Sequence, residues 1–328
     1  MPLPLLAIAA LGGTLSMTAR DGAPGIQPSV DAQAMLAALP QLGAMARVQA
    51  QTLRLVPSAS LTFVQLLEVF DWANAQIAAG AAGVIVTQGT DTLEESAFLL
   101  DLLWPHPQPL VFTAAMRGAA QVSADGPANL LAAATVALAP GSAGRGVLVV
   151  MNDSVHAARH VRKTHTLALD AFTSPGHGPL GSLVEGQVRY RHGATPRQPL
   201  PRPTRSDHQV ALLEATLAAD TLLLEQLPAL GYAGLVVAGS GAGHVSAEWA
   251  EVLTGIAAAM PVIIASRTGQ GSTARQTYGY VGSEIDLQRR GALMAGELCP
   301  RKCRLLMWVL AGSGGDVRGR LGDWLAAI

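Results

Sequence analysis

Cysteine, lysine and aromatic residues are all scarce in this sequence of 328 residues. Only two cysteines occur, Cys299 and Cys303, and their spacing of four suits two thiols on one helical face better than a disulfide framework. No cluster of histidine or further cysteine completes a set of metal ligands beside them. We therefore expect no disulfide framework, no bound metal and no other cofactor.

The balance of apolar, aromatic and charged residues narrows the fold class and the kind of partner. Aromatic residues make up 4% of the chain and apolar residues 50%, so the core must be built largely from Ala, Leu and Val, which suits helices packed on a parallel sheet. The 22 basic and 23 acidic residues nearly cancel, so the chain offers no electrostatic footprint for nucleic acid or anionic lipid. We expect a small-molecule ligand and no nucleic-acid or membrane partner.

Long apolar runs are absent as well. None approaches the ~20 residues that a membrane-spanning helix requires. The apolar start of the chain lacks the positively charged segment that precedes the apolar region of a signal peptide. Cleavage there would also remove or fray residues 5–10, which we predict to be the first buried strand. The sequence therefore predicts a cytoplasmic protein.

Short apolar runs that end in small or polar residues are present instead. Near-continuous apolar strands that alternate with helical patterns indicate a parallel sheet covered by helices on both faces. Ligands of such sheets bind beyond the carboxyl ends of the strands, where the polar residues that follow each run would lie. The predicted strands are residues 5–10, 83–86, 110–112, 146–150, 234–238 and 261–265.

A polar segment rich in proline and arginine divides the chain near residues 191–210. Its prolines and its lack of interleaved aromatic residues favour a solvated linker over a nucleic-acid patch. A chain of this length also exceeds the usual size of a single core. We therefore predict an α/β fold with a larger N-terminal parallel-sheet domain of the flavodoxin or Rossmann-like type over 1–190, a linker over 191–210, and a smaller C-terminal α/β domain over 211–328.

The best-defined helix follows the strand predicted at 83–86. Thr92 and Glu95 have the spacing of a capping box, in which each side chain bonds a backbone N–H group of the first turn. Thr90 and Asp91 would then lie just before the N-terminus of this helix. Free backbone N–H groups at that position can stabilise a developing oxyanion.

Several residues could carry chemistry, and each has a plain structural alternative. Thr14 follows two glycines at the end of the first strand and is either a nucleophile or a capping threonine. The chain contains only two lysines, of which Lys163 is one, but twenty arginines. Lys163 is therefore either kept for a role that the permanent charge of an arginine would not allow, or is an ordinary surface residue. Because a neighbouring carboxylate favours the charged ammonium, it stays open whether Asp91 orients Lys163 or activates it. The glycine-rich loop at 239–243 either binds phosphate or forms a turn.

Taken together, these segments resemble the bacterial-type L-asparaginases over nearly the whole chain. Gly12-Gly13-Thr14-Leu15 is similar to the first threonine signature of that family, and Thr87-Gln88-Gly89-Thr90-Asp91-Thr92-Leu93-Glu94-Glu95 is similar to the second. Ala115-Met116-Arg117 resembles the segment after the next strand, and Lys163 has the placement of the family's downstream lysine.

The resemblance implies hydrolysis of L-asparagine to L-aspartate and ammonia through an acyl-enzyme, without a cofactor. Thr14 would be the nucleophile, and Thr90, Asp91 and Lys163 would activate the second step or assist the first. It also implies a homodimer or homotetramer in which each active site is closed by a neighbouring subunit.

The same resemblance implies the residues that hold the substrate. Ser58 and Asp91 would bind its α-carboxylate and α-amino groups. The other substrate-binding residues that the resemblance implies are Ala59, Gly89, Thr90, Ala115, His244 and, from a neighbouring subunit, Glu284. The backbone N–H groups of Thr90 and Ala115 would serve as oxyanion donors.

Glu284 fits the family pattern, and three other features depart from it. Glu284 matches the acid that a neighbouring subunit contributes, whereas His244 stands where many relatives have asparagine and Ala59 where many have glutamine. The segment Leu15–Leu36, which should carry a tyrosine that activates the nucleophile, contains none.

Other functions compatible with these residues stay open. Minor L-glutaminase activity is compatible with the pattern, because one methylene changes binding by only ~1–3 kcal/mol in a pocket that accepts it. An amidase for another asparagine derivative, a catalytically weak or inactive amino-acid-binding regulator, and a nucleotide-binding α/β protein are the alternatives.

Overall fold

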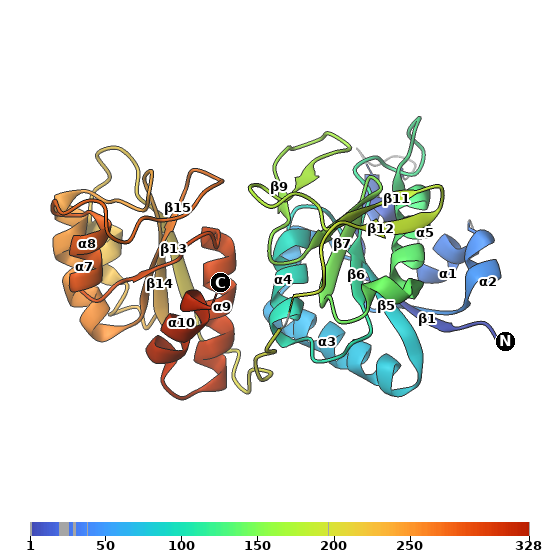
Figure 1. The fold of residues 1–328 in the computed structure, drawn as a ribbon, viewed down its shortest axis with the longest axis horizontal. Helices are drawn as coiled ribbons and strands as arrows, with labels where there is room; N and C mark the ends of the chain where they lie inside the picture. Colours follow the sequence, from blue (N-terminus) through green and yellow to red (C-terminus); the bar gives the residue numbers. More distant parts are fainter. Residues whose placement is uncertain (1, 20–25, 29–30, 38, 196, 328) are drawn as a thin grey trace. The chain divides into compact units, whose positions relative to one another are not determined.

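The computed structural model describes residues 2–19, 26–28, 31–37, 39–195 and 197–327. The chain forms two compact units, Met1–Pro199 (unit 1) and Leu200–Ile328 (unit 2). The boundary between them falls inside the segment 191–210, between the last strand of unit 1 and the first of unit 2. Each unit has its own sheet with helices on both faces, so the predicted α/β fold class is confirmed (Figure 1).

Unit 1 is built on an eight-stranded sheet in the order β12-β11-β8-β7-β6-β5-β1-β4. The five strands from β4 to β7 in this order run parallel, and β8, β11 and β12 extend the sheet with antiparallel pairs. The parallel strands β1, β5, β6 and β7 are almost entirely buried, as their near-continuous apolar sequences predict. The bounds are β1 Leu5–Ala10, β4 Arg47–Thr52, β5 Ala81–Thr87, β6 Leu110–Thr113, β7 Val147–Met151, β8 Ser154–Ala157, β11 Gly181–Val184 and β12 Gln187–Tyr190.

Helices cover both faces of this sheet. On one face α2 packs beside α5, and on the other α3 packs beside α4 (Figure 1). The helices are α1 Ala32–Ala37, α2 Gln41–Met45, α3 Phe63–Ala78, α4 Leu93–Leu103 and α5 Gly126–Leu138. Two short ladders complete the unit, β2 Met17–Ala19 with β3 Ile26–Pro28 and β9 Arg162–Lys163 with β10 Phe172–Thr173.

The capping box predicted for the start of α4 is not formed, although the helix begins at Leu93 as expected. Thr92 is the N-cap residue, but its hydroxyl donates a hydrogen bond to the carbonyl oxygen of Ser58 at 2.9 Å instead of accepting one from its own helix. Sequence spacing indicates only bonds within one element, and here a contact between two loops takes the hydroxyl.

Unit 2 contains a parallel four-stranded sheet in the order β13-β14-β15-β16. Helices α6, α7 and α8 pack on one face of this sheet and form a hydrophobic core with it. Helices α9 and α10 cover the other face (Figure 1). The bounds are β13 Val210–Glu214, α6 Leu222–Gln226, β14 Gly234–Gly239, α7 Ala247–Ala259, β15 Val262–Ser266, α8 Glu284–Arg289, β16 Leu293–Met294, α9 Pro300–Ser313 and α10 Val317–Ala326.

Both cysteines lie at the start of α9, where Cys299 is the N-cap residue and Cys303 lies in the helix. Both thiols are buried and free. In the part of the chain that the structure describes, His, Cys, Asp and Glu nowhere form a group of three or more able to hold a metal ion. Over the same residues, no helix combines the length and the apolar character needed to cross a membrane.

Candidate functional site

The carboxyl ends of β1, β5 and β6 lie side by side in unit 1. Ala10 pairs with Thr87, and Thr87 pairs with Thr113. The Leu11 N–H donates to the Thr87 carbonyl at 2.9 Å, and the Gln88 N–H donates to the Thr113 carbonyl at 3.3 Å. The polar segments that follow these three strands therefore leave the sheet at one edge, where parallel α/β sheets bind their ligands.

Glycines let two of these segments touch. Gly13 has a φ of 87° and a ψ of −179°, a backbone conformation open essentially to glycine alone. A β-carbon at Gly13 would overlap the backbone of Gly89, and one at Gly89 would lie 2.8 Å from the Ser58 Oγ. The loop that carries Thr14 is thus packed directly against the loop that carries Thr90.

Thr14 begins a short 3-10 helix, Thr14–Ser16, and is half-buried. Among the residues that the structure describes, none forms a hydrogen bond with the Thr14 hydroxyl. Residues 20–25 and 29–30 of the segment expected to carry an activating tyrosine lie outside the described residues.

Lys163, Thr90 and Asp91 meet beside this loop. The Lys163 Nζ lies 2.8 Å from the Thr90 Oγ1 and 2.8 Å from an Asp91 carboxylate oxygen. Thr90 is buried, whereas the Asp91 side chain is 69% exposed. The structure therefore places a hydroxyl, an ammonium group and a carboxylate in one hydrogen-bonded set at the strand ends.

The backbone of Lys163 is fixed as firmly as its side chain. Its N–H donates a hydrogen bond to the buried carboxylate of Glu94 on α4, and Lys163 pairs with Phe172 in the ladder of β9 with β10. A neutral lysine can accept the proton of a hydroxyl and its ammonium form can return it, so this set can move a proton to and from Thr90.

Ser58 supplies a buried hydroxyl next to the two loops. It begins a 3-10 turn, Ser58–Ser60, and is 3% exposed. Its Oγ has no hydrogen-bond partner among the described residues. Leaving such a group unpaired costs about 1–3 kcal/mol, so the hydroxyl is suited to a polar ligand group that enters the site. Ala59 follows it and is exposed.

The turn after β6 presents Ala115. Asp125 accepts hydrogen bonds from the backbone N–H groups of Met116 and Arg117, and the Asn129 amide donates to the Ala114 carbonyl at 3.0 Å. Among the described residues, no acceptor faces the backbone N–H of Ala115 or that of Thr90. Two backbone donors are thus left for an oxygen of a ligand.

His244 and Glu284 lie in unit 2 and contact each other. The His244 Nε2 lies 3.0 Å from a Glu284 carboxylate oxygen, and the Glu284 side chain is fully buried. The glycine-rich loop before His244 forms a tight turn in which Ser240 and His244 exchange backbone hydrogen bonds of 2.8 Å. The N–H groups of Ser240, Gly243 and His244 are used within the turn, so the loop positions His244.

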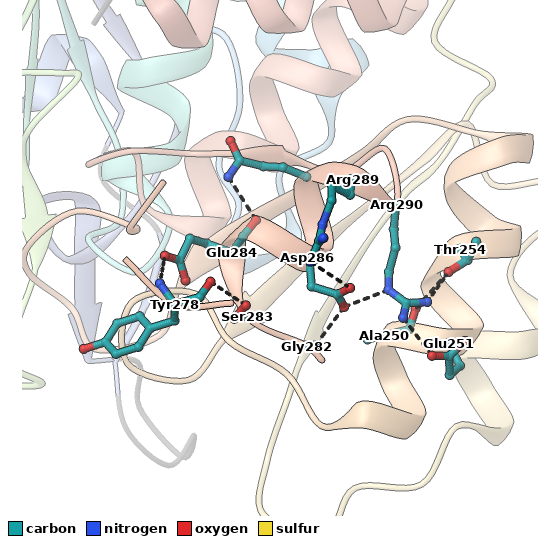
Figure 2. A network of polar contacts seen from close by, with 11 residues as sticks. Ala250, Glu251, Thr254, Tyr278, Gly282, Ser283, Glu284, Asp286, Arg289 and Arg290 are labelled. Carbon is teal, nitrogen blue, oxygen red and sulfur yellow. Dashed lines mark hydrogen bonds and ion pairs between the residues drawn. The ribbon is translucent and has the colours of Figure 1, made fainter. Parts of the chain in front are cut away.

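The Glu284 carboxylate is held ionised by its surroundings. Burial alone would raise its pKa, but backbone N–H groups, including those of Tyr278 and Thr277, together with His244 hold the pKa below its usual value. Figure 2 shows the carboxylate directed at the Tyr278 N–H, and beside it Asp286, which binds Arg290. This network makes the segment before α8 rigid.

Three residues that contribute to these sites were given no role from the sequence alone. Glu94 anchors Lys163, and its only signal was its position within the second threonine signature, to which no role was given. Asp125 fixes the turn after Ala115 by accepting a hydrogen bond from the Met116 N–H, nine residues before it. The Tyr280 hydroxyl lies 2.8 Å from the His244 Nδ1, a contact across 36 residues that no spacing rule predicts.

Comparison with protein families matches both units of the chain. The model described as Asparaginase, N-terminal, matches residues 5–196, and the model described as Glutaminase/Asparaginase C-terminal domain matches residues 209–318. A protein named Probable L-asparaginase from Deinococcus radiodurans is 37% identical over 95% of this chain and 94% of its own length. A subunit of a glutamyl-tRNA(Gln) amidotransferase from Methanosarcina acetivorans is 31% identical over 94% of this chain and 74% of its own length.

A solved structure shows the same fold. The crystal structure of a probable cytoplasmic L-asparaginase from Campylobacter jejuni matches with a TM-score of 0.90 and 28% sequence identity, covering 99% of this chain and 100% of that chain.

Proposed function

The chain belongs to the bacterial-type L-asparaginase family, and from this premise we propose that it hydrolyses L-asparagine to L-aspartate and ammonia through an acyl-enzyme on Thr14. The enzyme class, a hydrolase that acts on a linear amide, follows from the family. The observation that carries the proposed chemistry is the hydrogen-bonded set of Lys163, Thr90 and Asp91 next to the loop of Thr14.

In the first step the Thr14 oxygen attacks the side-chain amide carbon of asparagine. The negative charge that develops on the amide oxygen is stabilised by the backbone N–H groups of Thr90 and Ala115, which have no other acceptor among the described residues. The amide nitrogen takes up the proton of the Thr14 hydroxyl and leaves as ammonia, and an ester links Thr14 to the aspartyl group.

In the second step a water molecule attacks this ester. Thr90 and Lys163 take the proton from the water, with Asp91 orienting the lysine, and the proton returns to the Thr14 oxygen as aspartate leaves. A hydroxyl in contact with a lysine is a recurrent arrangement for moving a proton to and from an ester or amide.

The substrate is held by groups that the chemistry does not consume. Ser58 donates its buried hydroxyl to the α-carboxylate, and the exposed carboxylate of Asp91 binds the α-ammonium group. A β-carbon at Gly89 would lie 2.8 Å from the Ser58 Oγ, so glycine there leaves that hydroxyl accessible to the substrate, and the exposed Ala59 leaves room beside Ser58.

His244 and Glu284 complete the site from a neighbouring copy of the chain. This assigns a function to the polar cluster of His244 and Glu284 in unit 2. The proposal requires a homodimer or homotetramer, and a fully active monomer in light scattering would contradict it. A cytoplasmic location is proposed with it, in line with the similar Campylobacter jejuni protein, which is named a probable cytoplasmic L-asparaginase.

The test is ammonia release by the purified protein, measured with L-asparagine, L-glutamine and D-asparagine. L-Asparagine should be turned over fastest and L-glutamine slowly. Thr14→Ala and Thr90→Ala should each lower turnover by about 10²–10⁴-fold while the melting temperature is kept. Release from none of these substrates, with aspartate still bound tightly, would replace the enzyme by an amino-acid-binding regulator.

A further inference from the structure

Three side chains of unit 2 form a continuous hydrogen-bonded chain from the interior to the surface. The Glu284 carboxylate contacts the His244 Nε2 at 3.0 Å, and the His244 Nδ1 contacts the Tyr280 hydroxyl at 2.8 Å. The exposed fraction rises from 0% for the Glu284 side chain to 17% for that of His244, and Tyr280 is 53% exposed. The group that this cluster presents to an incoming molecule is therefore the phenol of Tyr280.

The direction of each hydrogen bond follows from the state of Glu284. A carboxylate that accepts hydrogen bonds from backbone N–H groups and is held ionised can only accept, so the His244 Nε2 must be the donor. In the neutral imidazole the other nitrogen is then an acceptor, and Tyr280 donates its hydroxyl proton to it. The Tyr280 oxygen is thereby left able to accept a further hydrogen bond.

This is the arrangement by which enzymes convert a hydroxyl into a proton acceptor. A hydroxyl contacts an imidazole, and a carboxylate on the far side orients the ring and stabilises the imidazolium that forms. The segment that carries Tyr280 is also held rigidly, because the Val245 N–H donates to the Gly282 carbonyl at 3.0 Å and the Ser283 hydroxyl donates to the Tyr278 carbonyl at 2.7 Å.

Unit 1 contains a hydroxyl that needs such a partner. Lys163 donates a hydrogen bond to Thr90, whereas no described residue forms a hydrogen bond with the hydroxyl of Thr14. A threonine hydroxyl is a poor nucleophile until a neighbouring group takes its proton.

We propose that Tyr280 of one copy is the proton acceptor for Thr14 of a neighbouring copy, with His244 and Glu284 acting as its positioning residues. The proposal rests on the proposed function and refines it, since the fully buried Glu284 acts through His244 and Tyr280 and does not touch the substrate.

The proton balance of the step is complete without a further reactant. As the Thr14 oxygen forms its bond to the amide carbon, its proton passes to the Tyr280 oxygen, and the Tyr280 proton passes to the His244 Nδ1. The imidazolium is stabilised by Glu284. The same path then runs in reverse, so that the amide nitrogen receives a proton when the carbon–nitrogen bond breaks and ammonia leaves.

The first test is Tyr280→Phe, which removes the hydroxyl and keeps the ring. The kcat for L-asparagine should fall by about 10²–10³-fold with KM changed by less than about threefold, as expected for lost general acid–base catalysis. Tyr232→Phe, which removes a phenol hydroxyl elsewhere in unit 2, should keep wild-type kinetics. A Tyr280→Phe enzyme with wild-type kcat would overturn the proposal.

A double substitution distinguishes whether His244 positions Tyr280 or only supports the fold. If His244 acts through Tyr280, His244→Asn should lower kcat, and adding it to Tyr280→Phe should lower kcat no further. Losses that multiply in the double variant would show that His244 acts independently of Tyr280 and would overturn its assigned role.

Mixing two inactive variants tests whether Tyr280 serves a neighbour. In a mixture of Thr14→Ala with Tyr280→Phe, a mixed dimer has one site with an intact Thr14 from one chain and an intact Tyr280 from the other. After subunit exchange, random pairing should restore about a quarter of wild-type activity. No recovery, with exchange verified by mass spectrometry of tagged subunits, would overturn action on a neighbour. The proposed function itself fails only if the wild-type protein releases no ammonia.

Discussion

The ammonium nitrogen of Lys163 lies 2.8 Å from the hydroxyl oxygen of Thr90, although 73 residues separate them in the sequence. Two anchors create this contact. The buried Glu94 binds the Lys163 N–H, and Asp91 binds the ammonium group from the other side. The fold thus uses one helix start, that of α4, to hold both partners of a proton transfer.

Replacing this lysine by arginine should remove its chemistry and keep its charge. Arginine stays protonated at every working pH and cannot take a proton from Thr90. Lys163→Arg should therefore lower kcat for L-asparagine by about 10²–10³-fold, measured as ammonia release, with the melting temperature nearly unchanged. Arg189→Lys, at an exposed position of β12, is the control and should have no effect. Near-normal turnover of Lys163→Arg would show that Lys163 supplies only charge.

Ser58 should contribute to substrate binding more than to the rate of chemistry. A hydrogen bond to a charged group is worth about 1.5–3 kcal/mol, so Ser58→Ala should raise KM for L-asparagine by about 10–100-fold and change kcat far less. Ser60 is an exposed residue of the same 3-10 turn, so Ser60→Ala is the matched control. Equal KM values for the two variants would remove Ser58 from the binding site.

Sequence patterns predicted six strands of the two main sheets, because apolar runs and their polar ends are local properties, whereas β4, β8, β11, β12, β13 and β16 were not predicted. Residues 5–10 coincide with β1, and the bounds of the other five predicted strands agree to within two residues with those of β5, β6, β7, β14 and β15. The parallel order then brought the segments of Thr14 and Thr90 together without any further information, since the ends of parallel strands share one edge.

The sequence could not predict contacts whose partners lie far apart along the chain. The Thr92 hydroxyl was expected to cap its own helix, but it bonds the Ser58 carbonyl across 34 residues. The Tyr280 contact with His244 likewise depends on how two loops of unit 2 fold against each other. Tertiary packing determines which of these bonds form, and neither secondary-structure propensity nor residue spacing predicts that packing.

Gly13 should tolerate no side chain. Its φ of 87° is unfavourable for other residues, and a β-carbon there would overlap the backbone of Gly89, which cannot move away as a flexible side chain could. Gly13→Ala should abolish measurable ammonia release and lower the melting temperature. Gly43→Ala, in α2 with no atom within 4 Å of the added carbon, should keep full activity and raise stability by about 0.5–1 kcal/mol. An active Gly13→Ala enzyme would contradict the close packing of the two loops.

Glu284 should make the stability of the protein depend on acid pH. Burial opposes its ionisation, but hydrogen bonds from backbone N–H groups and from His244 hold its pKa in the folded state below that in the unfolded state. The pKa of glutamate in an unfolded chain is ~4.3. A lowered folded pKa contributes stability that is fully present above the unfolded value and is lost as the pH falls through the folded one. Thermal unfolding from about pH 6 to about pH 3 should therefore show a smaller fall in melting temperature for Glu284→Gln than for the wild type. Glu248→Gln, at an exposed position of α7, should follow the wild-type curve. If the Glu284→Gln curve also runs parallel to that of the wild type, the carboxylate is not held ionised by its surroundings, and the proton path assigned to Tyr280 loses its acceptor.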